Sequence, residues 1–215
     1  MELRDPGRLT TVTKTMLWLW LLLDLAVSTS ALFTIDVQGG LGGDVAPADR
    51  LTLADRITRL VGIGYALAFA AAAITVLRWT YVTNRNAHAV SDWPLVSPGG
   101  AVGWYFVPFA GLYKPFQAMR ESWQASMNPA NPAAVPVPSV MRWWWGAWII
   151  LSLVGNVTFR LSLDAKTPIR IIVSHWGALV STPFDIVATV ALTIVITRLS
   201  DAQRALIVTG GTVDV

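Results

Sequence analysis

The chain has 215 residues, of which 54% are hydrophobic and only 13% are charged. Soluble domains carry about 25% charged residues, so this composition indicates a membrane protein. Cysteine is absent, which excludes disulfides, thiolate metal sites and cysteine nucleophiles. The net charge is +3, but the basic residues flank apolar runs instead of forming one patch, so nucleic acid is not an expected partner. No cofactor is expected, and two histidines, His88 and His175, leave little for a metal site.

Four segments are apolar for the roughly 20 residues that a bilayer crossing needs. We therefore predict an all-α integral membrane protein with four transmembrane helices. A cytosolic N-terminal segment (1–14) precedes a single membrane domain (15–205), and a flexible tail (206–215) follows it. The spans are expected at about 15–34, 57–79, 143–160 and 169–199.

The first apolar segment has an alternative interpretation as a cleaved signal peptide. Basic residues precede it, and the small residues of "STSA" lie near its end. Asp24 within the apolar core and the length of the run favour an uncleaved span.

The distribution of basic residues predicts the orientation of the spans. With four crossings, ten lysines and arginines fall on one side and six on the other, and the richer side is expected to be cytosolic. Both termini then face the cytosol, and the Gly-rich loop 36–49 faces outward. A fifth crossing at 98–113 would make the tally eight against eight, so four are favoured. The ten are Arg4, Arg8, Lys14, Arg78, Arg85, Lys114, Arg120, Arg142, Arg198 and Arg204, and the six are Arg50, Arg56, Arg59, Arg160, Lys166 and Arg170.

Between the second and third spans, residues 84–126 are predicted to form an interfacial hairpin on the cytosolic side. Residues 98–113 are apolar but are interrupted by glycines and a proline, and bare irregular backbone is not tolerated against lipid. We expect this part to be re-entrant or to lie at the interface. Pro115 then suits the first turn of an amphipathic surface helix, and a stiff, extended Pro-rich linker (128–138) follows it.

The hairpin supplies the first set of candidate site residues. Arg85, Lys114 and Arg120 are predicted to form a basic rim for anionic lipid headgroups or an acidic protein partner, with Glu121 pairing one of them. The alternative for residues 83–88 is a solvated end of the second helix. The candidates for headgroup or partner binding are Asn84, Arg85, Asn86, His88, Lys114, Gln117, Arg120, Glu121 and Trp123.

A second candidate site lies within the spans, where ionisable groups are costly and raise a functional hypothesis. Asp24, Asn156 and Asp185 all approach mid-depth when helical rise is counted from the flanking charges. They are predicted either to carry a proton or an ion, with Asn156 as a hydrogen-bonding partner, or to be neutral packing groups. In the packing alternative, Ser28, Ser181 and Thr189 one turn away would hydrogen-bond the acids.

The stretches "LRWTYVTNRNAHAV", "SPGGAVGWYFVPFAGLYKPFQAMRESWQAS" and "WWWGAW" together resemble the bacterial membrane family catalogued as domain of unknown function 4328. The resemblance covers roughly residues 55 to 205, and the pattern from Ser97 to Ser126 is its most distinctive part. Tyr113 stands where many members have tryptophan. The resemblance implies a multi-span protein of the bacterial inner membrane, and it brings no activity, cofactor or catalytic residues.

Three classes of function remain open from the sequence. The leading hypothesis is a non-enzymatic membrane protein that binds a protein partner or anionic lipid through its cytosolic hairpin. The second is a small transporter or channel subunit that uses Asp24 and Asp185. The third is a lipid-modifying enzyme with His88 or Glu121 as acid or base, although no nucleophile–base spacing is visible. A homo-oligomer is compatible with each of them.

The orientation is testable with reporter fusions. Fusions after Ser126 and after Arg204 should both report a cytosolic position, and a fusion near Gly42 should report an external one, because four crossings return the chain to its starting side. An external signal at Ser126 would contradict the four-span prediction.

Overall fold

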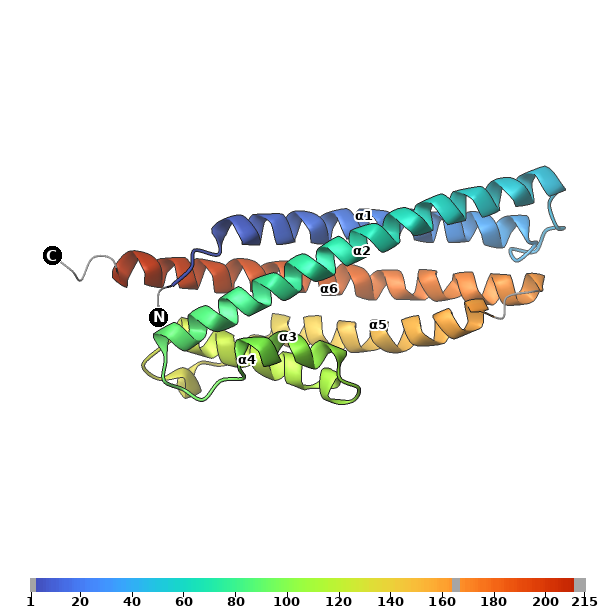
Figure 1. The fold of residues 1–215 in the computed structure, drawn as a ribbon. Coiled ribbons are helices and arrows are strands. Elements are labelled where there is room, and N and C mark those ends of the chain that lie inside the picture. The colour runs from blue at the N-terminus through green and yellow to red at the C-terminus, as the bar shows by residue number, and fades with distance from the viewer. Residues whose placement is uncertain (1–2, 164–166, 211–215) are drawn as a thin grey trace. The chain divides into compact units, whose positions relative to one another are not determined.

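The computed structural model describes residues 3–163 and 167–210, and every regular element in these ranges is helical. This confirms the predicted all-α class. The α-helices are α1 (Gly7–Val37), α2 (Ala48–Val90), α3 (Pro98–Gly103), α4 (Lys114–Met127), α5 (Ser139–Leu163) and α6 (Pro168–Gly210) (Figure 1). Three short 3₁₀ turns accompany them: η1 (Trp104–Phe106), η2 (Ala110–Leu112) and η3 (Pro132–Ala134).

Within the described residues, three helices are long and apolar enough to cross a membrane: α1, α2 and α6. Because α2 and α6 have 43 residues each, both are about 65 Å long, roughly twice the thickness of the hydrocarbon core. Each must therefore extend beyond a bilayer that it crosses. The predicted third span belongs to α5, which is not among the three.

The predicted ends of two segments differ from the structure. Residues 206–210, predicted as part of a flexible tail, continue α6 as helix, and residues 211–215 lie outside the described ranges. The linker 128–138 is not uniformly extended, because η3 forms a turn in it that packs against α4. Gln124 fixes this linker by donating its side-chain N–H to the carbonyl of Val135 at 2.9 Å.

The chain divides into two compact units. The helices α1, α2, α5 and α6 each contribute one part to each unit, whereas α3 and α4 belong wholly to unit 1. Unit 1 consists of Met1–Met16, Ala72–Trp145 and Ala191–Val215, and unit 2 consists of Leu17–Ala71 and Gly146–Val190.

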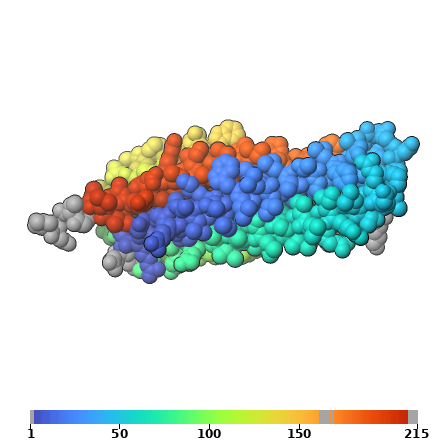
Figure 2. Space-filling model, turned by 90° about the horizontal axis from the view of Figure 1, so that it is seen from above, coloured from blue at the N-terminus to red at the C-terminus, as the bar shows by residue number. Residues whose placement is uncertain are grey.

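Unit 2 is a set of apolar helices joined by a few polar and aromatic contacts. The parts of α1 and α2 in this unit lie side by side (Figure 1 and Figure 2). Trp20 of α1 packs against Tyr65 and Phe69 of α2, with ring centroids 6.2 and 6.1 Å apart. On the outer faces of the helices large apolar side chains are exposed, as expected for a lipid-facing surface. They include Leu22, Leu60, Leu67, Leu153 and Val180.

Unit 1 has a core in which most of α4 is buried. Trp79, Met119 and Met141 are fully buried there, and α3 packs against α4. The helix predicted at 115–124 exists, but it does not lie on the surface, because no residue between 114 and 126 is exposed. The expected apolar anchors face inward: Met119 and Trp123 are buried, and Phe116 packs on Trp145. Small residues on the opposite face, including Ala118 and Ala125, allow neighbouring segments to approach on that side as well.

Gly177 of α6 marks a close approach to α5 within unit 2. A Cβ added there would overlap the side chain of Thr158, whereas a Cβ at Gly155 of α5 would meet open space. We predict that Gly177→Ala lowers stability by about 1–3 kcal/mol, the usual cost of overpacking. The measurement is thermal unfolding in detergent, with Gly155→Ala as the matched control. Equal unfolding temperatures for the two variants would contradict this contact.

Candidate functional sites

Two buried amide side chains, Asn86 and Gln203, join four segments of unit 1. Asn86 donates to Gln203 Oε1 at 2.9 Å and to the carbonyl of Arg4 at 2.8 Å, and it accepts from the Arg4 N–H at 3.0 Å. Gln203 in turn donates to the carbonyl of Thr83 at 2.8 Å and to Ser126 Oγ at 2.9 Å. The N-terminal segment, α2, α4 and α6 therefore meet at one hydrogen-bonded node, and we call these two residues the amide node.

A second polar chain runs along α4. Lys114 Nζ donates to Gln117 Oε1 at 3.1 Å, and Gln117 Nε2 donates to Glu121 Oε1 at 2.7 Å. The other oxygen of Glu121 accepts from the backbone N–H of Val96 at 2.7 Å. The Glu121 carboxylate is buried and is held by two N–H donors, not by a member of the predicted basic rim. Its role here is to fix the segment before α3 onto α4.

Asn84, Arg85, His88 and Arg120 occupy the region where α2 faces α4. Asn84 is buried and donates to Ser122 Oγ at 3.0 Å, while the Nδ1 atom of His88 lies 3.0 Å from the Asn84 carbonyl oxygen. Arg85 and Arg120 are half-buried, and the Nε of Arg120 is buried without a hydrogen bond to a described residue. The structure therefore brings Asn84 and Asn86 into the core, which rules out the alternative that residues 83–88 are a solvated helix end.

The segment from the end of η1 to the residue after η2 exposes several large apolar side chains. Phe106 is 73% exposed and Phe109 is 84% exposed. Phe109 also has a positive φ of 61°, a conformation that costs a non-glycine residue about 1–3 kcal/mol. We call residues 106–113 the apolar tip; its exposed members are Phe106, Val107, Phe109, Leu112 and Tyr113.

Contacts beneath the apolar tip hold it in place. Trp145 of α5 donates its indole N–H to the carbonyl of Leu112 at 3.1 Å. The N–H of Gly111 bonds to the carbonyl of Val107 at 2.8 Å, closing the loop. Burial raises the pKa of the Tyr105 hydroxyl above its ordinary value. The exposed rings are thus presented by a fixed loop.

In unit 2, the structure brings together two of the three predicted intramembrane residues. Asp24 of α1 and Asp185 of α6 are 5% and 4% exposed, and each lies one turn from a member of the Ser28–Thr182 hydrogen bond. Asn156 is exposed on α5 and forms no hydrogen bond to either acid, so its predicted role as their partner is wrong. Helix α5 directs that position outward, because its residues 155–157 are all exposed.

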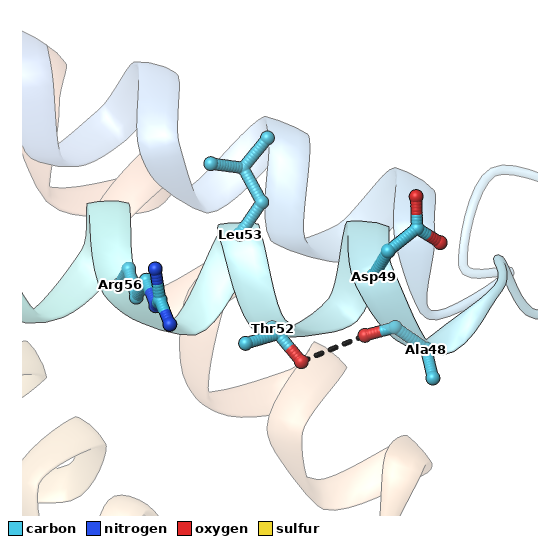
Figure 3. Close-up of a pocket in the computed structure, with 5 residues that line it drawn as sticks. All are labelled: Ala48, Asp49, Thr52, Leu53 and Arg56. Atoms are coloured by element: carbon cyan, nitrogen blue, oxygen red, sulfur yellow. Dashed lines mark hydrogen bonds between the residues drawn. The ribbon is translucent and has the colours of Figure 1, made fainter.

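A shallow hollow of about 380 Å³ lies at the start of α2 (Figure 3). Ala48, Asp49, Thr52, Leu53 and Arg56 line it, and Thr52 Oγ1 donates to the carbonyl of Ala48 at 2.7 Å. The side chains of Asp49, Leu53 and Arg56 point away from one another, so the hollow holds no convergent set of binding groups. Nor does any group of three or more His, Asp or Glu residues in the described ranges suit a metal ion.

Sequence reasoning did not identify Gln203, Tyr65 or the exposed face of the apolar tip. Gln203 looks like an ordinary polar residue near the end of an apolar helix, and only its spacing from Leu199 and Ser200, also buried, hints at an inward position. Tyr65 lies one turn from Phe69 on α2 and stacks against it at 6.4 Å. Neither pattern distinguishes a site residue from a packing residue.

Comparison with known proteins gives one finding. The family model described as "Domain of unknown function (DUF4328)" matches residues 44–201. No curated protein and no solved structure matches the chain. The matched range includes Asn84, Asn86, the apolar tip and Asp185, and it excludes Asp24 and Gln203.

The amide node yields a stability prediction. Asn86→Ala should lower the free energy of unfolding by about 2–4 kcal/mol, because it leaves Gln203 and both backbone groups of Arg4 without this partner. Asn131→Ala, at an exposed position of the linker, is the matched control and should change stability by less than about 0.5 kcal/mol. Thermal unfolding in detergent measures both, and equal effects would show that the node is not a stabilising element.

Proposed function

Because this chain belongs to the family described as domain of unknown function 4328, which specifies no reaction, we propose a function from the geometry. The chain is a four-span, non-enzymatic protein of the bacterial inner membrane. It contacts the cytosolic leaflet through the apolar tip and binds anionic lipid headgroups beside it. The exposed, conformationally strained Phe109 in a fixed loop is the observation that carries this proposal.

The contacts at the two ends of the chain support an even number of crossings. Arg4, just before α1, and Gln203, near the end of α6, both bond to Asn86. Thr10 and Ser200 add a direct hydrogen bond of 2.6 Å between α1 and α6. If only α1, α2 and α6 crossed the bilayer, these two ends would lie on opposite sides. A crossing by α5 resolves this, which makes it the fourth span.

The charges of the two units support a cytosolic position for the basic residues of unit 1. Unit 1 has ten lysines and arginines and six acidic residues, so its formal net charge is 10 − 6 = +4. Unit 2 has six basic and seven acidic residues, so its formal net charge is 6 − 7 = −1. The ten basic residues in unit 1 are the same ten that the four-span topology assigns to the cytosol. The positive-inside rule therefore places both termini and the hairpin there.

The surroundings of the apolar tip support its contact with lipid. It rests on Trp145 in the tryptophan-rich first turns of α5, where residues typical of a membrane interface begin a span. Exposure of the phenylalanine rings to water is unfavourable in free energy, and contact with lipid would remove this unfavourable term. Glycine would suit the positive φ of Phe109 better, so the exposed ring stands at a position where a large side chain costs free energy.

Positive charge beside the apolar tip supports a preference for anionic lipid. Lys114 follows the tip directly and lies over the Tyr113 ring at 5.5 Å. A basic residue near an anionic surface contributes about 1 kcal/mol. A protein partner remains the alternative occupant. We favour lipid because the proposed four-span topology would bring the tip beside the bilayer.

Spin labelling tests the proposal, and the absence of cysteine allows single sites to be labelled. In nanodiscs, a label on Val107→Cys should be accessible to oxygen and shielded from a water-soluble nickel complex, as expected for a position below the headgroups. A label on Ala133→Cys, at an exposed position of the linker, should show the opposite accessibility. Water-like accessibility at Val107 would overturn the lipid contact, and shielding from both reagents would indicate a protein neighbour instead.

The same nanodiscs test the headgroup preference. Replacing Lys114 by alanine should reduce the enrichment of anionic lipid around the protein about fivefold, the equivalent of about 1 kcal/mol. The effect should be larger at low salt than at high salt. Lys114 is only half-buried, so dissolved ions screen the attraction between its charge and the headgroups. If the enrichment of anionic lipid is unchanged at every salt concentration, the proposed headgroup preference is wrong.

A further inference from the structure

The geometry of unit 2 places two acids opposite each other in an apolar interior. A hydrogen bond between Ser28 of α1 and Thr182 of α6 sets the register of these two helices. Asp24 lies one turn from Ser28 and Asp185 lies one turn from Thr182, so both carboxyls occupy the next level of the same interface. Both side chains are almost completely buried, which agrees with this placement.

The neighbouring hydroxyls do not satisfy these acids. Ser28 is bonded to Thr182, and Ser181 donates to the carbonyl of Gly177 at 3.0 Å. Thr189, one turn beyond Asp185, is 99% buried, and its hydroxyl has no partner among the described residues. One oxygen of Asp24, Oδ2, is likewise buried without a partner. The interface therefore holds buried polar atoms that the described side chains leave unsatisfied.

No protein cation neutralises the two acids within the described ranges. The ion pair found there, Arg204 with Asp5, belongs to unit 1. From α2, the titratable group packed against α1 is Tyr65, whose ring contacts Trp20. Other titratable or charged residues on the described helices of unit 2 are exposed or lie near helix ends. They are Asp36, Asp49, Arg50, Asp55, Arg56, Arg59, Arg160, Arg170 and His175.

We propose that Asp24 and Asp185 together bind one proton and form a proton-binding site within the membrane. Two carboxylates at the same level of this interface cannot both remain ionised, because like charges repel and an apolar interior does not solvate them. One shared proton removes one charge and supplies a donor for the other carboxylate. A divalent cation is disfavoured, because it needs about six oxygen ligands and the two acids offer at most four.

A hydrophobic carbodiimide tests the site, because it reacts with carboxyl groups that are protonated and lie in apolar surroundings. The full-length protein in nanodiscs is treated with dicyclohexylcarbodiimide at a series of pH values, and adducts are mapped by mass spectrometry. At neutral pH we expect about one adduct per chain, on Asp24 or Asp185, and none on the exposed Asp55. Labelling should be lost in the variant with both Asp24→Asn and Asp185→Asn.

Each single variant tests whether the two acids act together. Removing one acid relieves the repulsion on the other, so the pH midpoint of labelling should fall by roughly one to three pH units in Asp24→Asn and in Asp185→Asn. If a variant fails to fold, labelling of the native chain with and without sodium decides. Protection by sodium would overturn the proton site in favour of a metal cation. Two adducts per chain, or none, would overturn the shared proton.

Discussion

The packing of unit 1 depends on the rule that a buried amide must have its hydrogen bonds made. Asn86 and Gln203 are both almost completely buried, and each has more than one donor and acceptor to satisfy. Leaving one such group unpaired costs about 1–3 kcal/mol, so alternative arrangements of the four segments are penalised. The amide node thereby selects one arrangement of the N-terminal segment, α2, α4 and α6. It also holds α4, on which the hairpin and its apolar tip rest.

Buried polar atoms without a protein partner occur in both units. In unit 1, Asn86, Gln203 and Glu121 bond to partners within the protein, whereas the Oδ1 of Asn84 and the Nε of Arg120 are buried without one among the described residues. In unit 2, Asp24 and Thr189 retain buried oxygen atoms without such a partner. What distinguishes unit 2 is that Asp24 and Asp185 are acids in an apolar interior, where an unpaired charge is costly.

Hydropathy and helical periodicity predicted much of the fold. The class, three long apolar helices and the helix at α4 follow from apolar runs and proline positions, which are local properties. The predictions that were wrong concern residues whose contacts are made by segments distant in the sequence. The polar face of α4 seemed suited to water, but Glu121 and Ser122 find partners near residues 84 and 96. Asn156 seemed equivalent to the acids at the same depth, yet the rotation of α5 turns it outward. The depth of a residue in the membrane follows from counting residues along the helix. The direction in which its side chain points depends on how the helices pack.

The amide node also has a consequence for biosynthesis. Its members are Asn86, in the first half of the chain, and Gln203, near its end, and it captures the backbone of Arg4. During synthesis, Arg4 and Asn86 are made long before Gln203, so unit 1 is incomplete until almost the whole chain has left the ribosome. A chain truncated before α6 leaves the Asn86 and Ser126 side chains without this partner. Such unpaired polar groups distinguish an incomplete chain from the complete one and can mark it for degradation by quality-control proteases.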